Sequence, residues 1–117
     1  MNDNNSLYQW LGIDYGRYKL CFNQQHDVFA AHFPDNPIVP AAYMIDIALE
    51  ICQQELGDMI KTISLREAKF LVPLTPDKTC LIELSDNHNG VCKINISDEH
   101  LIYAKMSFTY LRSDSDL

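Results

Sequence analysis

The chain has 117 residues, of which 47% are hydrophobic, and its formal net charge is -7 at pH 7. This length suits a single domain, residues 1–117, that can bury a core without disulfide or metal staples, and it leaves no room for a second domain. The acidic balance argues against nucleic acid or an anionic membrane as the main partner, because both bind cationic surfaces.

The N-terminus and the cysteines both favour a reducing, cytoplasmic location. The first six residues have neither the basic nor the apolar part of a signal peptide, and no apolar run approaches the length of a membrane span. Cys21, Cys52, Cys80 and Cys92 form no Cys-x-x-Cys pair and no set with zinc-ligand spacing. We therefore expect buried or free thiols and no metal site.

The first third of the chain contains one clear strand signal and one loop signal. Arg17–Phe22 is a plausible first strand, followed by polar residues. Three prolines at three-residue spacing predict an ordered loop from about His32 to Val39, because proline fits neither a helix interior nor a central strand. The polar ends, residues 1–6 and 113–117, are expected to fray.

A single helix is expected from Pro40 to just before Gly57. Proline suits the first helical turn and glycine the position after the last one, and the length corresponds to four to five turns. Apolar residues cover nearly all faces from Ala41 to Ala48. Such a helix is expected to be enclosed on several sides.

The second half of the chain alternates strand patterns with turns. In the last run, apolar residues alternate with polar ones, as in a half-buried strand, and Asn89-Gly90 suits a hairpin turn. The expected fold class is α+β, a single antiparallel sheet curled around one long helix, with the last four strands in a meander. These strands are expected at residues 61–72, 79–85, 91–97 and 101–111.

The most informative motif lies between the loop and the helix. The segment His32–Asp46 reads His-Phe-Pro-Asp-Asn-Pro-Ile-Val-Pro-Ala-Ala-Tyr-Met-Ile-Asp. It resembles the hot-dog 3-hydroxyacyl-acyl-carrier-protein dehydratases, whose signature His-Phe-x-Gly-x-Pro-x-x-Pro-Gly leads into a helix bearing Glu or Asp. Ala68–Asp77 resembles a second motif of that family, Lys-Phe-x-x-Pro-x-x-Pro-Gly-Asp. The resemblance extends over residues 28–110, and it implies a hot-dog fold.

The resemblance implies roles for two side chains. His32 would take the proton next to the thioester carbonyl, since imidazole titrates near neutral pH. Asp46, directly or through water, would help to protonate the leaving hydroxyl. The amides of Ala41 and Ala42, at the start of the helix, are candidate donors to the thioester oxygen. No metal or organic cofactor is required.

Two residues differ from the family motif, and a third resembles one branch of the family. Asp35 and Ala41 stand where relatives have glycine. Asp46 in place of Glu resembles the dehydratase-isomerase branch, although isomerase activity is not predicted. Asp46 lies between Ile45 and Ile47, where a carboxylate in an enclosed helix needs a polar cavity or a partner.

The sequence gives less support for a functional role of the remaining polar side chains. Glu50 lies one turn after Asp46 and could approach the same site, but a solvent-side or dimer-edge position is the simpler expectation. The other histidines, His26, His88 and His100, lie in polar, turn-like stretches and are expected at the surface.

The family resemblance also implies a dimer whose sheets join edge to edge. Each active site would then take histidine from one chain and the carboxylate from the other, in a homodimer or in a heterodimer with another hot-dog subunit. Arg66 and Lys69 could contact the acidic acyl carrier protein, although charged residues on an exposed strand are common without such a role. The acyl chain would lie in an apolar tunnel lined by Phe33, Val39, Tyr43, Phe70 and Val72.

The expected reaction is dehydration of (3R)-3-hydroxyacyl thioesters to trans-2-enoyl thioesters, in fatty acid, polyketide or aryl polyene synthesis. Two alternatives remain open. A hot-dog thioesterase would use the helix carboxylate to activate water but would not need His32. A non-catalytic partner subunit of a heterodimer is consistent with Asp35 and Ala41, whereas His32 and Asp46 argue against it.

Overall fold

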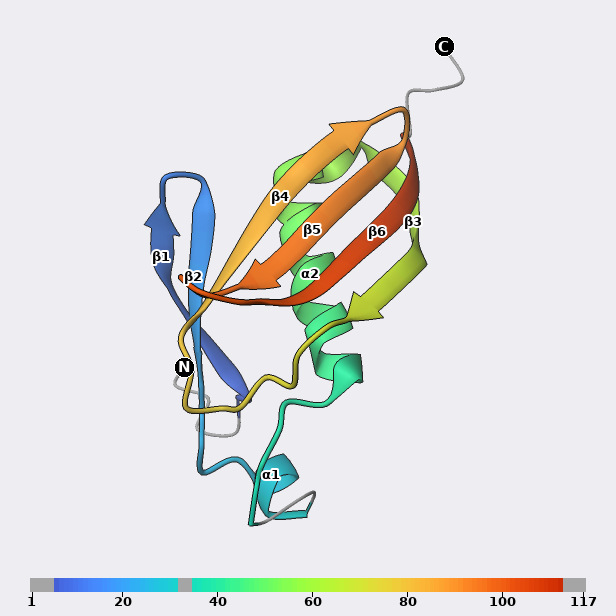
Figure 1. The fold of residues 1–117 in the computed structure, drawn as a ribbon. Helices are drawn as coiled ribbons and strands as arrows, with labels where there is room; N and C mark the ends of the chain where they lie inside the picture. The colour runs from blue at the N-terminus through green and yellow to red at the C-terminus, as the bar shows by residue number, and fades with distance from the viewer. Residues whose placement is uncertain (1–5, 32–34, 113–117) are drawn as a thin grey trace.

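A computed structural model describes residues 6–31 and 35–112, apart from the side chain of Met59. The strands and helices follow one another in an order that places one long helix between two groups of strands (Figure 1). The elements are β1 (Tyr8–Asp14), β2 (Arg17–Phe22), α1 (Asp27–Ala31), α2 (Ala41–Leu56), the 3₁₀ turn η1 (Gly57–Met59), β3 (Ile60–Phe70), β4 (Cys80–His88), β5 (Val91–Ser97) and β6 (Ile102–Arg112).

The strands form one six-stranded antiparallel sheet in the order β1-β2-β4-β5-β6-β3. The predicted sheet with one long helix is therefore confirmed, but the four-strand meander is wrong in one connection. Strands β4, β5 and β6 are sequential neighbours, whereas β3 pairs with β6 and occupies an edge. Helix α2 lies between β2 and β3 in the sequence, and β3 after it lies at the far edge of the sheet. Residues 71–79 then return across the width of the sheet to β4 (Figure 1).

Strand β1 was missed from the sequence. It pairs with β2 as a hairpin, and the turn residues Tyr15 and Gly16 have φ angles of 52° and 77°. Two successive residues with positive φ make the tight turn that suits the twist of a hairpin. The register shifts between Trp10 and Gly12, where a bulge interrupts the regular alternation of β1. In the sequence, Gly16 was the signal that could have predicted this hairpin turn. The short helix α1 was also not predicted.

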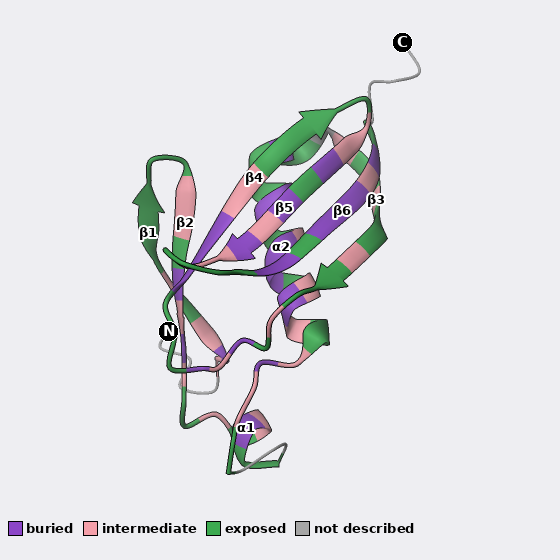
Figure 2. Cartoon of the chain, viewed as in Figure 1, coloured by how far each residue is buried: buried purple, intermediate pink, exposed green. Residues whose placement is uncertain are grey.

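The core lies between α2 and the inner face of the sheet. Helix α2 packs against β3, β4, β5 and β6, and Figure 2 shows buried segments along α2 and along β5 and β6. Each large apolar side chain removed from water in this way contributes roughly 1.5–3 kcal/mol. The buried residues of α2 are Met44, Ile47, Ala48, Ile51, Cys52 and Leu56.

The expectation that α2 is enclosed on several sides is wrong for the single chain. One face packs on the sheet, but Ala42, Asp46 and Glu50 on the other side are exposed. The sheet curls around only part of the helix, so it covers one face of α2. The exposed face is the one on which the motif carboxylate lies.

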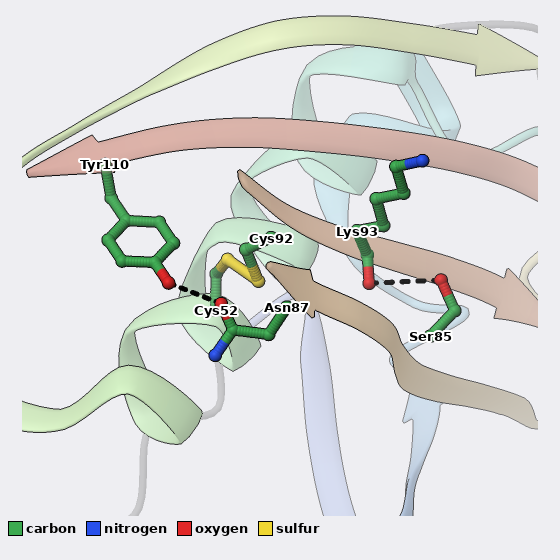
Figure 3. The surroundings of a disulfide bond; sticks show 6 residues. All are labelled: Cys52, Ser85, Asn87, Cys92, Lys93 and Tyr110. Carbon is green, nitrogen blue, oxygen red and sulfur yellow. Dashed lines mark hydrogen bonds between the residues drawn. A yellow bond between two sulfur atoms is a disulfide. The ribbon is translucent and has the colours of Figure 1, made fainter. Parts of the chain in front are cut away.

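The expectation of free thiols is wrong for two of the four cysteines. Cys52 on α2 and Cys92 on β5 form a disulfide, with their Cα atoms 6.6 Å apart (Figure 3). Both residues face the interior between helix and sheet, an arrangement that their separation in the sequence could not reveal. Cys80 is a buried free thiol, and Cys21 is a half-buried one. Burial, and after it the charge of Asp98, raises the pKa of the Cys80 thiol to about 12.

Candidate functional site

The N-terminus of α2 presents backbone donors. The helix begins after Pro40, which has no side-chain group to cap it. The amides of Tyr43 and Met44 donate to the Pro40 carbonyl at 3.1 and 3.3 Å. In the described part of the chain, the amides of Ala41 and Ala42 have no such acceptor, and both residues are exposed. They are therefore available to an anionic or carbonyl oxygen, which the helix dipole also favours.

An apolar pocket of about 240 Å³ lies beside this helix start. Two backbone hydrogen bonds hold its walls: the Val39 amide donates to the Leu74 carbonyl at 2.7 Å, and the Leu71 amide donates to the Tyr103 carbonyl at 2.8 Å. Its size and lining suit a short alkyl chain better than a polar ligand. The lining residues are Ile38, Val39, Ala41, Met44, Phe70, Leu71, Val72, Pro73 and Leu74.

Three of the five residues predicted to contact the acyl chain line this pocket. They are Val39 from the loop before α2, Phe70 from the end of β3, and Val72 just after it. Tyr43 is half-buried on α2 and does not line the pocket. Phe33 lies outside the described residues.

Asp46 lies on the exposed side of α2, about one turn beyond the free amides. The predicted burial of this carboxylate is wrong for the single chain: Asp46 is exposed, although the β1–β2 hairpin reaches this side of the helix at Glu50. The charge of Asp46 is one of the causes that raise the pKa of the Tyr8 hydroxyl on β1. Burial is the largest cause of that rise, followed by the hydrogen bond to Glu50.

Glu50 anchors the β1–β2 hairpin to the exposed side of α2. Tyr8 Oη donates to Glu50 Oε1 at 2.8 Å, and Trp10 Nε1 donates to Glu50 Oε2 at 2.6 Å. The hydroxyl of Tyr18 donates to the next carboxylate along the helix, that of Glu55. Edge-to-face ring contacts join Tyr8 to Trp10 and Trp10 to Tyr18. Glu50 is thus exposed, as expected, but it is also a structural acceptor.

The sequence signal for this anchor was the alternation of aromatic residues at positions 8 and 10. In a strand, this spacing puts both rings on one face.

His32 lies outside the described residues, so its approach to Asp46 stays a prediction. Helix α1 ends at Ala31, immediately before it, and the described chain resumes at the exposed Asp35. The two residues predicted to contact the carrier protein, Arg66 and Lys69, are both exposed on β3. Lys69 also lines a polar groove together with residues of β4, β5 and β6, and Arg66 is not among the lining residues of that groove.

The remaining histidines have structural or surface positions. His26 Nδ1 accepts a hydrogen bond from the Val28 amide at 3.0 Å, at the start of α1. His88 and His100 are exposed. Within residues 6–31 and 35–112, no group of three or more His, Cys, Asp or Glu side chains is arranged as a metal site.

A family described as ApeI-like, ApeI dehydratase, matches residues 14–107. The chain belongs to the ApeI-like dehydratase family. A curated relative, the 3-hydroxyacyl-[acyl-carrier-protein] dehydratase FabZ of Ehrlichia canis (strain Jake), is 30% identical over 56% of this chain and 52% of its own length. The ApeI-like chain thus spans about half the length of that relative.

A solved structure shares the fold. It is described as the dehydratase heterocomplex ApeI:P from Xenorhabdus doucetiae, with a TM-score of 0.68, 23% identity, and coverage of 82% of this chain and 86% of that chain. The predicted hot-dog fold is confirmed for this ApeI-like chain. None of the helices in its described residues is both long enough and apolar enough to span a membrane.

Proposed function

We propose that this chain is a 3-hydroxyacyl-acyl-carrier-protein dehydratase, a carbon–oxygen lyase that acts in the cytoplasm as a single hot-dog domain over residues 1–117. It converts (3R)-3-hydroxyacyl thioesters to trans-2-enoyl thioesters in fatty acid, polyketide or aryl polyene synthesis. One observation carries the proposal: the free amides of Ala41 and Ala42 lie between an apolar pocket and the exposed carboxylate of Asp46 on the same helix.

Each of these site residues has one role in the proposed reaction. The acyl chain enters the pocket against Val39, Phe70 and Val72, while the amides of Ala41 and Ala42 donate to the thioester oxygen, where negative charge develops. His32 removes a proton from C2, and the electron pair of that bond forms the C2–C3 double bond as the C3–O bond breaks. Asp46, directly or through water, helps to protonate the leaving hydroxyl, which departs as water. No cofactor takes part.

A dimer explains why Asp46 is exposed in the single chain. Strand β3 is an edge of the sheet, and Leu65 and Phe70 on it are 43% and 44% exposed. Pairing of this edge with a second hot-dog subunit would cover apolar surface. In that assembly the histidine of one chain meets the carboxylate of the other, with Phe33 and Tyr43 completing the acyl tunnel. Arg66 and Lys69 would contact the acyl carrier protein.

The test is the rate of enoyl thioester formation from 3-hydroxyacyl thioesters, on both coenzyme A and carrier protein, followed by absorbance. His32→Ala and Asp46→Asn are each expected to lose about a hundred- to ten-thousand-fold in rate. The matched controls His88→Ala and Asp58→Asn change exposed residues outside the pocket and are expected to retain activity. Full turnover by His32→Ala would contradict the mechanism, and release of free thiol instead of enoyl product would favour the thioesterase.

A second candidate function is that of a non-catalytic partner subunit. It is favoured by the fold shared with a dehydratase heterocomplex and by Ala41 at the helix start, where the family motif has glycine. An inactive purified chain that raises the turnover of an active hot-dog subunit on mixing, with no loss on Asp46→Asn, would support this role. Turnover by the purified chain alone would exclude it.

A further inference from the structure

The sheet carries a shallow groove of about 300 Å³. Of the site residues discussed above that the structure describes, only Lys69 lines it. Three of the six lysines of the chain lie in it. Its lining comes entirely from the neighbouring strands β3, β4, β5 and β6. The residues are Glu67, Lys69, Ser85, Lys93, Asn95, Lys105, Met106 and Ser107.

The groove opens on the side of the sheet away from α2. Cys92 points from β5 toward the helix, where it meets Cys52, and its neighbour Lys93 points the other way (Figure 3). Successive side chains of a strand alternate between the two faces, so Lys93 belongs to the outer face. The sheet therefore separates this groove from Asp46 and from the rest of α2.

The strand register concentrates positive charge in the groove. Lys69 of β3 lies directly opposite Lys105 of β6, and Asn95 of β5 lies on the other side of Lys105. In the next row, Ser107 lies between Glu67 and Lys93. Like charges in directly opposed positions destabilise a sheet. The pair is therefore retained at some cost to the stability of the folded chain.

Asp86 of β4 lies opposite Lys93 in the strand register, but it forms no ion pair with it. None of the three groove lysines forms an ion pair within residues 6–31 and 35–112, where the ion pair that is present joins Lys19 to Asp14 in the β1–β2 hairpin. Glu67 is the one carboxylate among the groove's lining residues, against three ammonium groups. In a chain with a net charge of -7, this outer face is a local cationic site that would attract an anionic partner.

The shape of the groove selects the kind of partner. Four adjacent strands form its floor, and its lining includes no residue of a helix or a loop. A small anion would gain few contacts on such an open floor, whereas an extended acidic segment can place several carboxylates across the three lysines. We propose that the outer-face groove around Lys69, Lys93 and Lys105 docks an acidic segment of a partner protein. This proposal does not rest on the dehydratase activity.

A fluorescein-labelled decaglutamate peptide is the probe, and fluorescence anisotropy measures its binding. The variant Lys69→Gln/Lys93→Gln/Lys105→Gln removes the groove charges. The matched control Lys19→Gln/Lys61→Gln/Lys78→Gln removes three charges elsewhere, so both variants have the same net charge. We expect binding to weaken roughly tenfold in the groove variant and less than twofold in the control, with wild-type binding weakened by added salt. Circular dichroism verifies that each variant is folded.

Three outcomes would overturn the proposal. Wild-type protein could fail to bind the peptide at low salt, or both variants could lose binding equally, which would indicate a general charge effect. Tighter binding of inorganic tripolyphosphate than of decaglutamate would make the groove a phosphate site instead of a protein-docking surface. Because the assay measures binding without turnover, its failure is distinct from a failure of the dehydratase proposal.

Discussion

On the face of α2 that lies against the sheet, Met44, Ile47 and Ile51 are between 1% and 3% exposed, whereas Asp46 and Glu50 on the opposite face are exposed. Adjacent residues of one helix thus have opposite surroundings. The buried face holds the helix on the sheet through apolar packing. The open face carries the motif carboxylate and the anchor of the β1–β2 hairpin, so substitutions on the buried face are expected to reduce stability more than substitutions on the open face.

The largest expected effect on stability comes from the buried face. Ile47→Ala removes a fully buried side chain between α2 and the sheet, and it is expected to lower the free energy of unfolding by about 2–5 kcal/mol. Its sequence neighbour provides the contrast, since Asp46→Asn is expected to change that free energy by no more than about 0.5 kcal/mol. Urea denaturation measures both. Equal destabilisation by the two variants would break the distinction between the faces.

A smaller effect is expected at the hairpin anchor. Glu50→Ala removes the acceptor for both Tyr8 and Trp10, and it is expected to lower the free energy of unfolding by about 1 kcal/mol, because these bonds are partly open to solvent. Gln54→Ala, a neighbouring exposed position on α2, is the control. Thermal unfolding followed by tryptophan fluorescence reports on Trp10 directly. An unchanged midpoint for Glu50→Ala would show that the hairpin holds without its anchor.

The smallest effect is expected in alkaline solution. Burial, and after it the hydrogen bond to Glu55, raises the pKa of Tyr18 to about 12, above the value of about 10 in an unfolded chain. A raised folded-state pKa means that the contribution of this group to stability is complete below pH about 10 and is lost as the pH rises through 12. Melting temperatures from pH 9 to 12 should therefore fall less steeply for Tyr18→Phe than for wild type. Identical slopes would contradict this account of Tyr18.

Local signals in the sequence predicted most of the secondary structure. Pro40 and Gly57 bracket α2 as expected, and β5 has the predicted bounds. Asn89 and Gly90 form the expected turn with φ angles of 53° and 77°. Such signals are readable because backbone preferences of proline, glycine and asparagine act within a few residues. Strand β1 was missed because its bulge breaks the alternation on which strand prediction depends.

The sequence by itself determined the family, the fold class, and the spacing of His32 and Asp46, because these follow from a motif that is continuous along the chain. Only the tertiary structure decided that β3 pairs with β6, that Cys52 meets Cys92, and that three lysines share one groove. Periodicity tells which side of an element faces the core, but not which distant element covers it. That choice depends on long-range packing, which also left Asp46 on the open side of its helix.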